Sequence, residues 1–440
     1  MKFYDIIKNR KTFVVSCILI AFASFGSYAQ TGLLSPYSSS GIGVEMPYLN
    51  ARFAGLGGTV IGITGSGSAN PFNPASYLRG VDTLSVAFHI GLNMGFVNLR
   101  QQREETILKN KGTTGGLSNI EFYFPIFKWW KMGVFLLPVT DIAYLSSSFR
   151  NTDSTNIGNT QLEHSGSGGL YRAGWGNAFG WGPVSVGFNL NYIVGKVEQL
   201  DRFAFLTDSL AMYSSETRNY RETSYNGFGW DVGIQYVQAI NRTDRLTIGA
   251  SYSGQSRFNA RRDGMITTEY MGGVSYTDTV AVFNSVRGKA TNPGILRTGI
   301  SYESMGRFLL AADFSCTWWK QYTSELDQIE QTGINQTYRA SIGAELLSDL
   351  RHNFWMRRLS YRVGANWQTY NYNYAGKQVS GFGVSLGVGI PIRRSRSNIY
   401  IFGEYSRMGN LKKGQIESSI GRIGVSFSSV ETWFVKMKYD

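Results

Sequence analysis

The sequence of 440 residues predicts an all-β fold: a transmembrane antiparallel β-barrel of about 14 strands with an N-terminal hatch, or plug, inside the lumen. Three observations predict this fold. Apolar residues alternate with small or polar residues from residue 82 onward. Long polar connections alternate with short ones along the same region. A glycine-rich segment that lacks the alternation precedes the first strand.

The alternation is clearest from Leu84 to Phe96, where even-numbered residues are apolar and odd-numbered residues are small or polar. It returns near 184–192, 228–236, 296–302, 359–367, 382–390 and 423–427. Because a strand places alternate side chains on opposite faces, each segment has one apolar face. The other face carries mostly Gly, Ser and Asn with isolated Arg and Asp. This composition favours a crowded lumen over the water-facing side of a soluble sandwich.

The connections between these segments indicate two different sides. Long polar segments lie near 101–116, 150–162, 199–222, 262–293, 321–336, 371–379 and 408–415, and short joins lie near 128–130, 181–183, 241–244, 304–306, 348–357 and 393–397. One side of an outer-membrane barrel typically has loops and the other has turns. We therefore expect external loops, periplasmic turns and an even number of strands. Tryptophans near strand ends, such as Trp129 and Trp355, predict an aromatic girdle.

The N-terminus predicts export. Four basic residues (Lys2, Lys8, Arg10 and Lys11) precede an apolar stretch at 13–25, and Ser27-Tyr28-Ala29 has small residues where a signal peptidase cleaves. No apolar stretch after residue 30 is long enough for a spanning helix, so the chain would cross a membrane as strands. We expect a signal peptide at 1–29, a hatch at 30–81 and a barrel at 82–440, located in the outer membrane of a Gram-negative bacterium.

The charge is strongly basic. The whole chain carries +13, and the four basic residues and Asp5 of the signal account for +3, which leaves +10 on the exported chain. An exported chain rarely meets nucleic acid, so the excess predicts contact with outer-membrane lipid and lipopolysaccharide instead. Cys316 is the single cysteine after the signal, so no internal disulfide framework is expected.

Residues 30–81 are rich in Gly, Ser, Pro and Asn and lack the periodicity needed to form a core of their own. A barrel of fourteen strands has a lumen too wide for its own side chains to fill. A segment folded back inside would fill it, because glycine allows the backbone to approach the wall closely. The hatch motif comprises Asn50, Arg52, Gly55, Gly57, Gly58, Asn70, Asn73, Pro74 and Ala75.

This motif resembles the hatch of long-chain fatty-acid transporter (FadL-like) barrels, in the form found in the Bacteroidetes branch. Similar stretches occur at 35–38, 166–179, 185–195 and 433–440. The resemblance implies a fourteen-stranded barrel with a hatch and passage of a hydrophobic small molecule. The same branch is similar to the accessory (PorV-like) barrels of type IX secretion, which serve a protein machine.

Three functions therefore stay open, and the fold does not decide among them. One of them is a purely structural or adhesion barrel, and the other two make more specific predictions. The first is a FadL-like conduit for hydrophobic small molecules. The alternative is a non-transporting accessory subunit of an outer-membrane protein assembly or secretion complex, which has other outer-membrane proteins as partners. A conduit predicts a continuous apolar pocket between loops and hatch. A subunit predicts a filled lumen and an exposed apolar patch.

Pro138 interrupts the third predicted strand. Proline donates no ladder hydrogen bond, so this position marks a bulge, an edge or a gap. In the family that the chain resembles, a kink in the third strand makes a side opening into the membrane. We hypothesise that Pro138 marks such an opening, with an ordinary curvature bulge as the alternative.

Motifs for catalysis are missing, so we expect no enzyme, catalytic residue, metal or cofactor. The three histidines lack metal-ligand spacing, and no nucleophile elbow or phosphate loop occurs. We expect a polar network in the lumen that braces the barrel, holds the hatch or binds a substrate carboxylate. Its candidate members are His89, Asp231, Arg297, Asp313, Glu345, Arg362 and Arg422.

Overall fold

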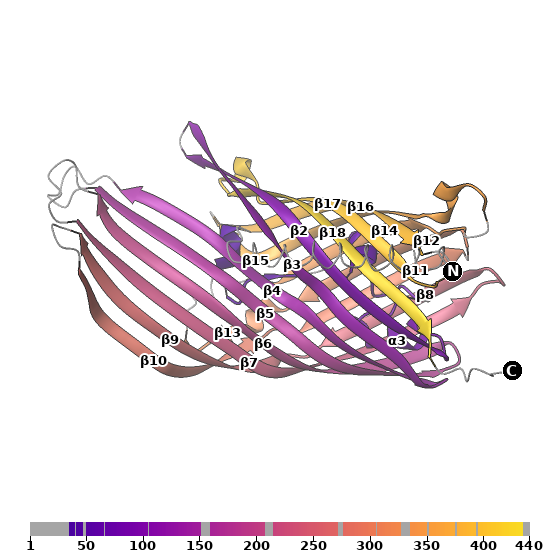
Figure 1. Ribbon diagram of the computed structural model, residues 1–440. Helices are drawn as coiled ribbons and strands as arrows, with labels where there is room; N and C mark the ends of the chain where they lie inside the picture. The colour runs from indigo at the N-terminus through magenta and orange to yellow at the C-terminus, as the bar shows by residue number, and fades with distance from the viewer. Residues whose placement is uncertain are drawn as a thin grey trace, which may run out of the picture.

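The protein is a closed antiparallel barrel of fourteen strands, as a computed structural model shows (Figure 1). The structure describes residues 35–39, 41–46, 50–65, 67–103, 105–150, 159–206, 214–271, 276–304, 306–326, 335–349, 352–374, 376–392 and 395–433. The expected signal peptide and the tail at 434–440 lie outside the described residues. The prediction of an all-β barrel with about 14 strands is confirmed.

Eleven wall strands are each continuous: β2 (Ser85–Arg103), β3 (Thr106–Phe127), β4 (Trp130–Arg150), β5 (Asn159–Trp181), β6 (Val184–Leu206), β7 (Ser214–Ala239), β14 (Thr337–Leu346), β15 (Ser360–Tyr374), β16 (Lys377–Pro391), β17 (Asn398–Met408) and β18 (Glu417–Thr432). Three more are each interrupted: β8 (Asp244–Ser253) continues as β9 (Ser256–Met271), β10 (Tyr276–Asn292) as β11 (Ile295–Ser304), and β12 (Phe308–Thr317) as β13 (Thr323–Ser324). The last strand pairs with the first over Glu417–Thr432 and Ser85–Arg100, which closes the sheet.

The length of four strands marks the membrane-spanning band. Strands β8, β11, β12 and β14 have ten residues each, the length that crosses the hydrocarbon core at a tilt of about 45°. We call the end of this band from which β9 and β10 continue its upper end; it lies toward the left in Figure 1. At this end the ring of Tyr252 contacts those of Trp230 and Trp318, with centroids 5.7 and 6.1 Å apart. Aromatic rings at this level are typical of the girdle at a membrane interface.

The described residues that precede the barrel, from 35 to 81, lie inside it (Figure 1). We call residues 35–46 the arm; it contains η1 (Pro36–Ser39) and β1 (Val44–Glu45). We call residues 50–81 the plug; it contains α2 (Ala51–Ala54), η2 (Pro74–Ser76) and α3 (Tyr77–Gly80). The remaining short helices join wall strands: η3 (Trp319–Gln321), η5 (Trp355–Arg358) and η6 (Leu411–Lys413). None of the helices in the described segments is long and apolar enough to cross a bilayer.

One half of the wall is much taller than the other. Above the band, β4–β7 continue together with β9 and β10 and extend well beyond β15–β18 (Figure 1). We call this six-stranded upper part the projecting sheet. The expectation of loops near 199–222 and 262–293 is therefore wrong for most of both segments. Their polar side chains mark the end of the hydrocarbon, whereas the strands continue because their ladder needs only backbone groups.

Glycines on the inner wall allow the plug backbone to touch the strands. A Cβ atom on Gly364 would lie 2.1 Å from the amide nitrogen of Gly57, and one on Gly249 would lie 2.3 Å from the carbonyl oxygen of Ile61. Real Cβ atoms do not approach so closely, so these positions require glycine. The small residues of the non-apolar face therefore make room for the plug.

Gly187→Ala should loosen the plug, because the added Cβ would lie 2.5 Å from the carbonyl carbon of Pro74. Overpacking of this kind costs about 1–3 kcal/mol of unfolding free energy. Faster proteolysis of the plug in the assembled barrel would measure the effect. Gly403→Ala is the matched control, since no atom lies within 4 Å of its added Cβ. Equal proteolysis of the two variants would contradict the close packing.

Candidate functional site

The plug is held by an ion-pair cluster deep in the lumen. Glu345 on β14 accepts from Arg52 of the plug at 3.1 Å and from Arg362 on β15 at 2.5 Å. All three side chains are buried, and the Arg362 guanidinium also lies 4.6 Å from the ring centroid of Tyr400. Burial alone would lower the pKa of Arg52, but the Glu345 carboxylate outweighs this and holds that pKa above its ordinary value. The cluster therefore ties plug to wall in the charged state.

The first hatch motif forms a capped turn of helix against β16–β18, followed by a glycine-rich turn against β14–β16. The Asn50 side chain accepts from the backbone N–H groups of Arg52 and Phe53 at 3.1 and 3.3 Å, which caps α2. The chain then turns through Gly55, Gly57 and Gly58, and the last two have φ of +71° and +85°. The Gly57 N–H donates to Ser385 Oγ at 3.0 Å. Glycine is required here for both the left-handed backbone and the close approach to the wall.

The second motif is a web of asparagine side chains. Asn70 Oδ1 accepts from the Asn73 N–H at 3.0 Å, and Asn73 Oδ1 accepts from the Ala75 N–H at 3.2 Å. Pro74 occupies the first position of η2, where its missing N–H costs nothing. Asn73 also donates to the carbonyl oxygen of Ile234 on β7 at 3.3 Å. These asparagines give an irregular backbone the hydrogen bonds that a helix or sheet would otherwise supply.

Asp313 on β12 binds the plug backbone. Its Oδ2 accepts from the N–H groups of Val60 and Ile61 at 2.6 and 2.9 Å. On the same side of the barrel, with β8 and β11 between it and β12, β7 carries Gln235, which donates to the carbonyl oxygen of Ile61 at 2.9 Å. Plug backbone in this stretch is thus held by two separate wall strands.

Asp231 and Arg297 form a second polar group above the plug. Asp231 accepts from Arg172 at 3.3 Å and from Asn191 at 2.8 Å. Arg297 lies 3.6 Å from Glu45 of the arm, and it donates to Ser253 at 2.9 Å. The guanidinium groups of Arg172 and Arg297 both lie over the ring of Phe72, 5.7 and 5.0 Å from its centroid.

The other two candidates lie elsewhere on the inner wall. Arg422 pairs with Glu404 at 3.1 Å rather than with one of the predicted acids. His89 is buried beside Tyr123, with ring centroids 5.9 Å apart, and the Tyr123 hydroxyl donates to Glu121 at 2.9 Å. The sequence analysis did not select Arg172, Glu404 or Glu121. All three lie on the non-apolar face of alternating strands, and that position is the signal that would have found them.

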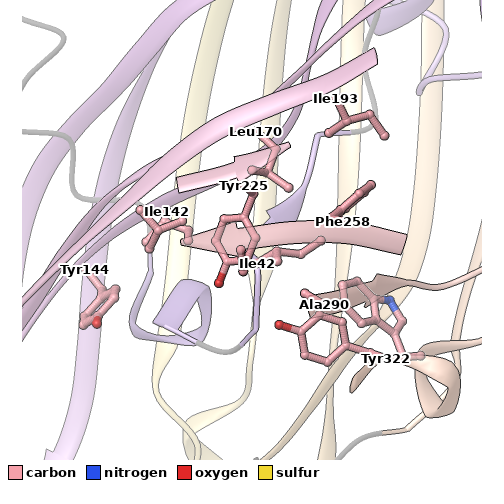
Figure 2. Packing of buried hydrophobic residues seen from close by; sticks show 12 residues of the cluster. Ile42, Ile142, Tyr144, Leu170, Ile193, Tyr225, Phe258, Ala290 and Tyr322 are labelled. Carbon is pink, nitrogen blue, oxygen red and sulfur yellow. The ribbon is translucent and has the colours of Figure 1, made fainter. Parts of the chain in front are cut away.

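An apolar cluster lies directly above the plug, where the taller wall begins (Figure 2). Ile42 of the arm is 1% exposed and packs at its centre. The surrounding side chains come from β4–β7, β9, β10 and the segment after β12: Ile142, Tyr144, Leu170, Ile193, Val197, Tyr225, Phe258, Ala260, Ala290, Trp319 and Tyr322. The arm therefore fills the apolar space between the plug and the projecting sheet.

Two cavities inside the described part of the barrel are lined by charged side chains. The larger measures about 830 Å³, part of it open to solvent, and is lined by Glu45, Arg297, Asp313 and Arg339 as well as Phe72. The smaller measures about 520 Å³ and lies between the Asp231–Arg172 pair and Pro138. Neither is the continuous apolar pocket that a conduit predicts.

Pro138 marks the place where the wall opens on one side. Strand β4 stays paired with β5 past Pro138, with a register shift between Pro138 and Thr140. Its pairing with β3 ends at Leu136, and the described residues of β3 and β4 do not pair above that point. The upper part of β3 pairs only with β2, so a hairpin diverges from the projecting sheet (Figure 1).

The arm covers the freed edge of β4. Strand β1 pairs with it through Val44 opposite Asp141, and the Met46 N–H donates to the carbonyl oxygen of Val139 at 2.8 Å. Further up, the Ser35 N–H donates to the carbonyl oxygen of Ala143 at 3.2 Å. The backbone groups that the gap exposes between Val139 and Ala143 are thus satisfied from inside the barrel.

The described residues contain no group of three or more His, Cys, Asp or Glu side chains placed to hold a metal ion. Most of the lumen side chains named above bind one another or the plug backbone, and this arrangement positions the arm and the plug.

Comparison with known proteins identifies a family and a fold. The model of the family described as BamG matches residues 9–440. No curated protein matches the sequence. Among solved structures, the toluene transporter TodX of Pseudomonas putida is 14% identical with a TM-score of 0.57, covering 88% of this chain and 99% of its own.

Two further structures share the fold. A FadL homologue of Pseudomonas aeruginosa is 12% identical with a TM-score of 0.56, covering 91% of this chain and 100% of its own. CymD, titled a monoaromatic hydrocarbon channel, is 14% identical with a TM-score of 0.54, covering 88% and 98%. At such identities the likeness extends to the FadL-type fold alone.

Glu345→Gln should free the plug, because it leaves Arg52 and Arg362 buried without a counter-charge. Removing one partner of a buried ion pair costs about 3–5 kcal/mol of unfolding free energy. Urea unfolding in detergent micelles measures the loss. The control is Asp82→Asn, which breaks an exposed pair with Arg396 and should change stability little. Equal stability of the two variants would show that the cluster does not hold the plug.

Proposed function

Because the chain belongs to the BamG family, we propose that it is an accessory subunit of an outer-membrane protein complex, in which the barrel anchors the projecting sheet outside the membrane. The observation that carries this proposal is the combination of a filled lumen with a sheet that rises beyond the barrel and has two open edges. The barrel supplies the membrane anchor, and the sheet supplies the surface for partners.

The filled lumen supports a role other than passage. Ion pairs and backbone hydrogen bonds hold the plug from several strands, and Ile42 closes the apolar space above it. A hydrophobic ligand is stabilised by about 25 cal/mol per Å² of apolar surface that it buries. The two cavities offer charged walls, which do not provide that stabilisation.

The projecting sheet supports a role in assembly. Its first edge is β4, which leaves β3 at Leu136, is covered by the arm from Val139 to Ala143 and is open above that residue. Its last edge is β10, which bonds described residues other than β9 at Lys289, Ala290 and Thr291. Open edges carry unpaired backbone groups that pair readily with other chains. A tall sheet with two such edges suits contact with proteins better than capture of a small molecule.

A conduit for a hydrophobic small molecule is the second candidate, and one observation favours it. The gap above Leu136 lies at Pro138, beside the cavity of about 520 Å³. Movement of the arm away from β4 would open this cavity sideways into the membrane. Toluene and monoaromatic hydrocarbons, named in the titles of TodX and CymD, would be the class of ligand.

The remaining expectations fit either function. We propose that residues 1–29 are a cleaved signal peptide, that residues 30–81 form the hatch and that residues 82–440 form the barrel. The protein would lie in the outer membrane of a Gram-negative bacterium, with lipopolysaccharide and outer-membrane lipid around the apolar band. The chain would act without catalysis, and the hatch motif and lumen network would have structural roles.

Extraction of the native protein in a gentle detergent tests the accessory role. We expect it to migrate on a native gel as a complex well above the 49.0 kDa of the chain, with a partner at fixed stoichiometry. Boiling in denaturant should return the single chain. A solitary barrel that carries bound hydrophobic ligand would contradict the accessory role and favour the conduit.

A disulfide lock distinguishes the two candidates. Val44→Cys and Asp141→Cys face each other in adjacent strands, at a spacing that a disulfide spans, in a Cys316→Ser background. The accessory role predicts that the oxidised protein keeps its complex and that uptake of labelled toluene by cells stays unchanged. A conduit predicts uptake that falls on oxidation and returns with reductant. The reduced form of the same variant is the control for the substitutions.

A further inference from the structure

Strand β10 ends the projecting sheet with a long free edge. It pairs with β9 from Tyr276 to Asn292, but on its other side the described residues pair only at Ala290 and Thr291, with β13. Within the described part of the chain, the outer side of residues 276–287 has no strand partner, and the Ser285 N–H donates to Asp263 on β9 at 2.7 Å. Native proteins normally shorten, cover or charge such an edge.

The free edge carries apolar side chains on both faces and lies outside the lipid. Val282 and Phe283 are adjacent, so they point to opposite faces, and they are 53% and 45% exposed. Val280, Val286 and Tyr276 are also exposed. All of β10 lies above the interruption at Pro293–Gly294, which is level with the aromatic girdle. Lipid therefore does not cover these residues.

The lower end of the edge is basic. Arg287 lies directly opposite Arg261 on the neighbouring strand, and Lys289 follows on the same face. Like charges placed opposite each other are destabilising, and Asp263, 3.3 Å from Arg261, is the acid that the structure pairs with this group. A carboxylate beside Arg287 would relieve the repulsion.

We propose that β10 is a docking strand: an extended segment of a partner protein, apolar toward its outer end and acidic near the membrane, adds to the sheet along residues 276–287. This inference rests on the proposed accessory role and names its contact. Backbone hydrogen bonds supply the affinity, and the alternate side chains supply the specificity. The register shifts between Thr279 and Ala281 and between Phe283 and Val286 disfavour pairing with an arbitrary straight strand.

A second copy of this chain does not fit the edge. Two copies inserted the same way in one membrane are related by an axis along the membrane normal. Antiparallel pairing of this edge with the same edge of a second copy requires a two-fold axis perpendicular to the sheet. That axis lies in the membrane plane, so it would turn one copy upside down. Pairing about an axis along the strand would place N–H groups opposite N–H groups. Head-to-tail pairing with β4 of a second copy would meet an edge that the arm already occupies from Val139 to Ala143. We therefore take the occupant to be a different chain.

Amide hydrogen exchange tests the proposal without knowledge of the partner. In native outer-membrane vesicles, the edge-facing amides of residues 276–287 should exchange at least about tenfold more slowly than in the purified protein, because a ladder must open first. Equal rates in the two preparations would overturn the proposal. So would slow exchange in purified protein reconstituted with lipopolysaccharide alone.

Two charge-matched variants separate edge pairing from contact with the face of the sheet. Val282→Lys should remove the protection and release the chain from its complex. Met265→Lys, directly opposite on β9 and 43% exposed, should leave the exchange protection and the complex unchanged. Val280→Lys repeats the test if Val282→Lys fails to fold. If a complex persists while Val282→Lys has no effect, the docking strand is wrong and the accessory role stands. If the native protein forms no complex at all, the accessory role is wrong, and the docking strand is wrong with it.

Discussion

A backbone hydrogen-bonding group cannot stay unpaired in hydrocarbon, and the rest of this structure depends on that constraint. It requires β18 to pair with β2, and it keeps the ladder continuous through the ten-residue spans. In the described part of the wall, strands are interrupted at the level of the aromatic girdle, at Gly254, at Pro293–Gly294 and at Trp318–Tyr322. Where β4 leaves β3, the arm supplies the missing partners from inside.

The same constraint governs the lumen, where water is scarce and the plug has little regular structure. Asparagine side chains, Asp313 and Gln235 bind the plug backbone, and Glu345 neutralises two arginines. A buried ion pair adds little net stability, because removing its charges from water is costly. The ion pair instead fixes the position of the plug. The plug fits only where wall glycines leave room for its backbone and a wall carboxylate faces its arginine.

Outside the membrane the constraint is lifted, and the fold departs from a simple barrel. Water satisfies unpaired edges, so β4–β7, β9 and β10 continue as an open sheet with free edges. The FadL-type fold is shared with transport proteins, yet here the apolar space above the plug holds Ile42 and the aromatic rings around it. The shared fold therefore does not by itself fix what occupies the interior of the barrel.

The sequence by itself determined the all-β fold, the number of strands and the face that meets lipid. Each of these follows from the alternation of apolar and polar residues, because that pattern indicates whether each side chain faces lipid or the lumen. Hydropathy does not report where a ladder ends, so the polar segments of β6, β7, β9 and β10 were predicted as loops. Only the tertiary structure decided that Arg422 meets Glu404, that Asp313 binds backbone and that the gap opens above Leu136. Such pairings depend on strand register and on the path of the plug, which are properties of segments far apart in the chain.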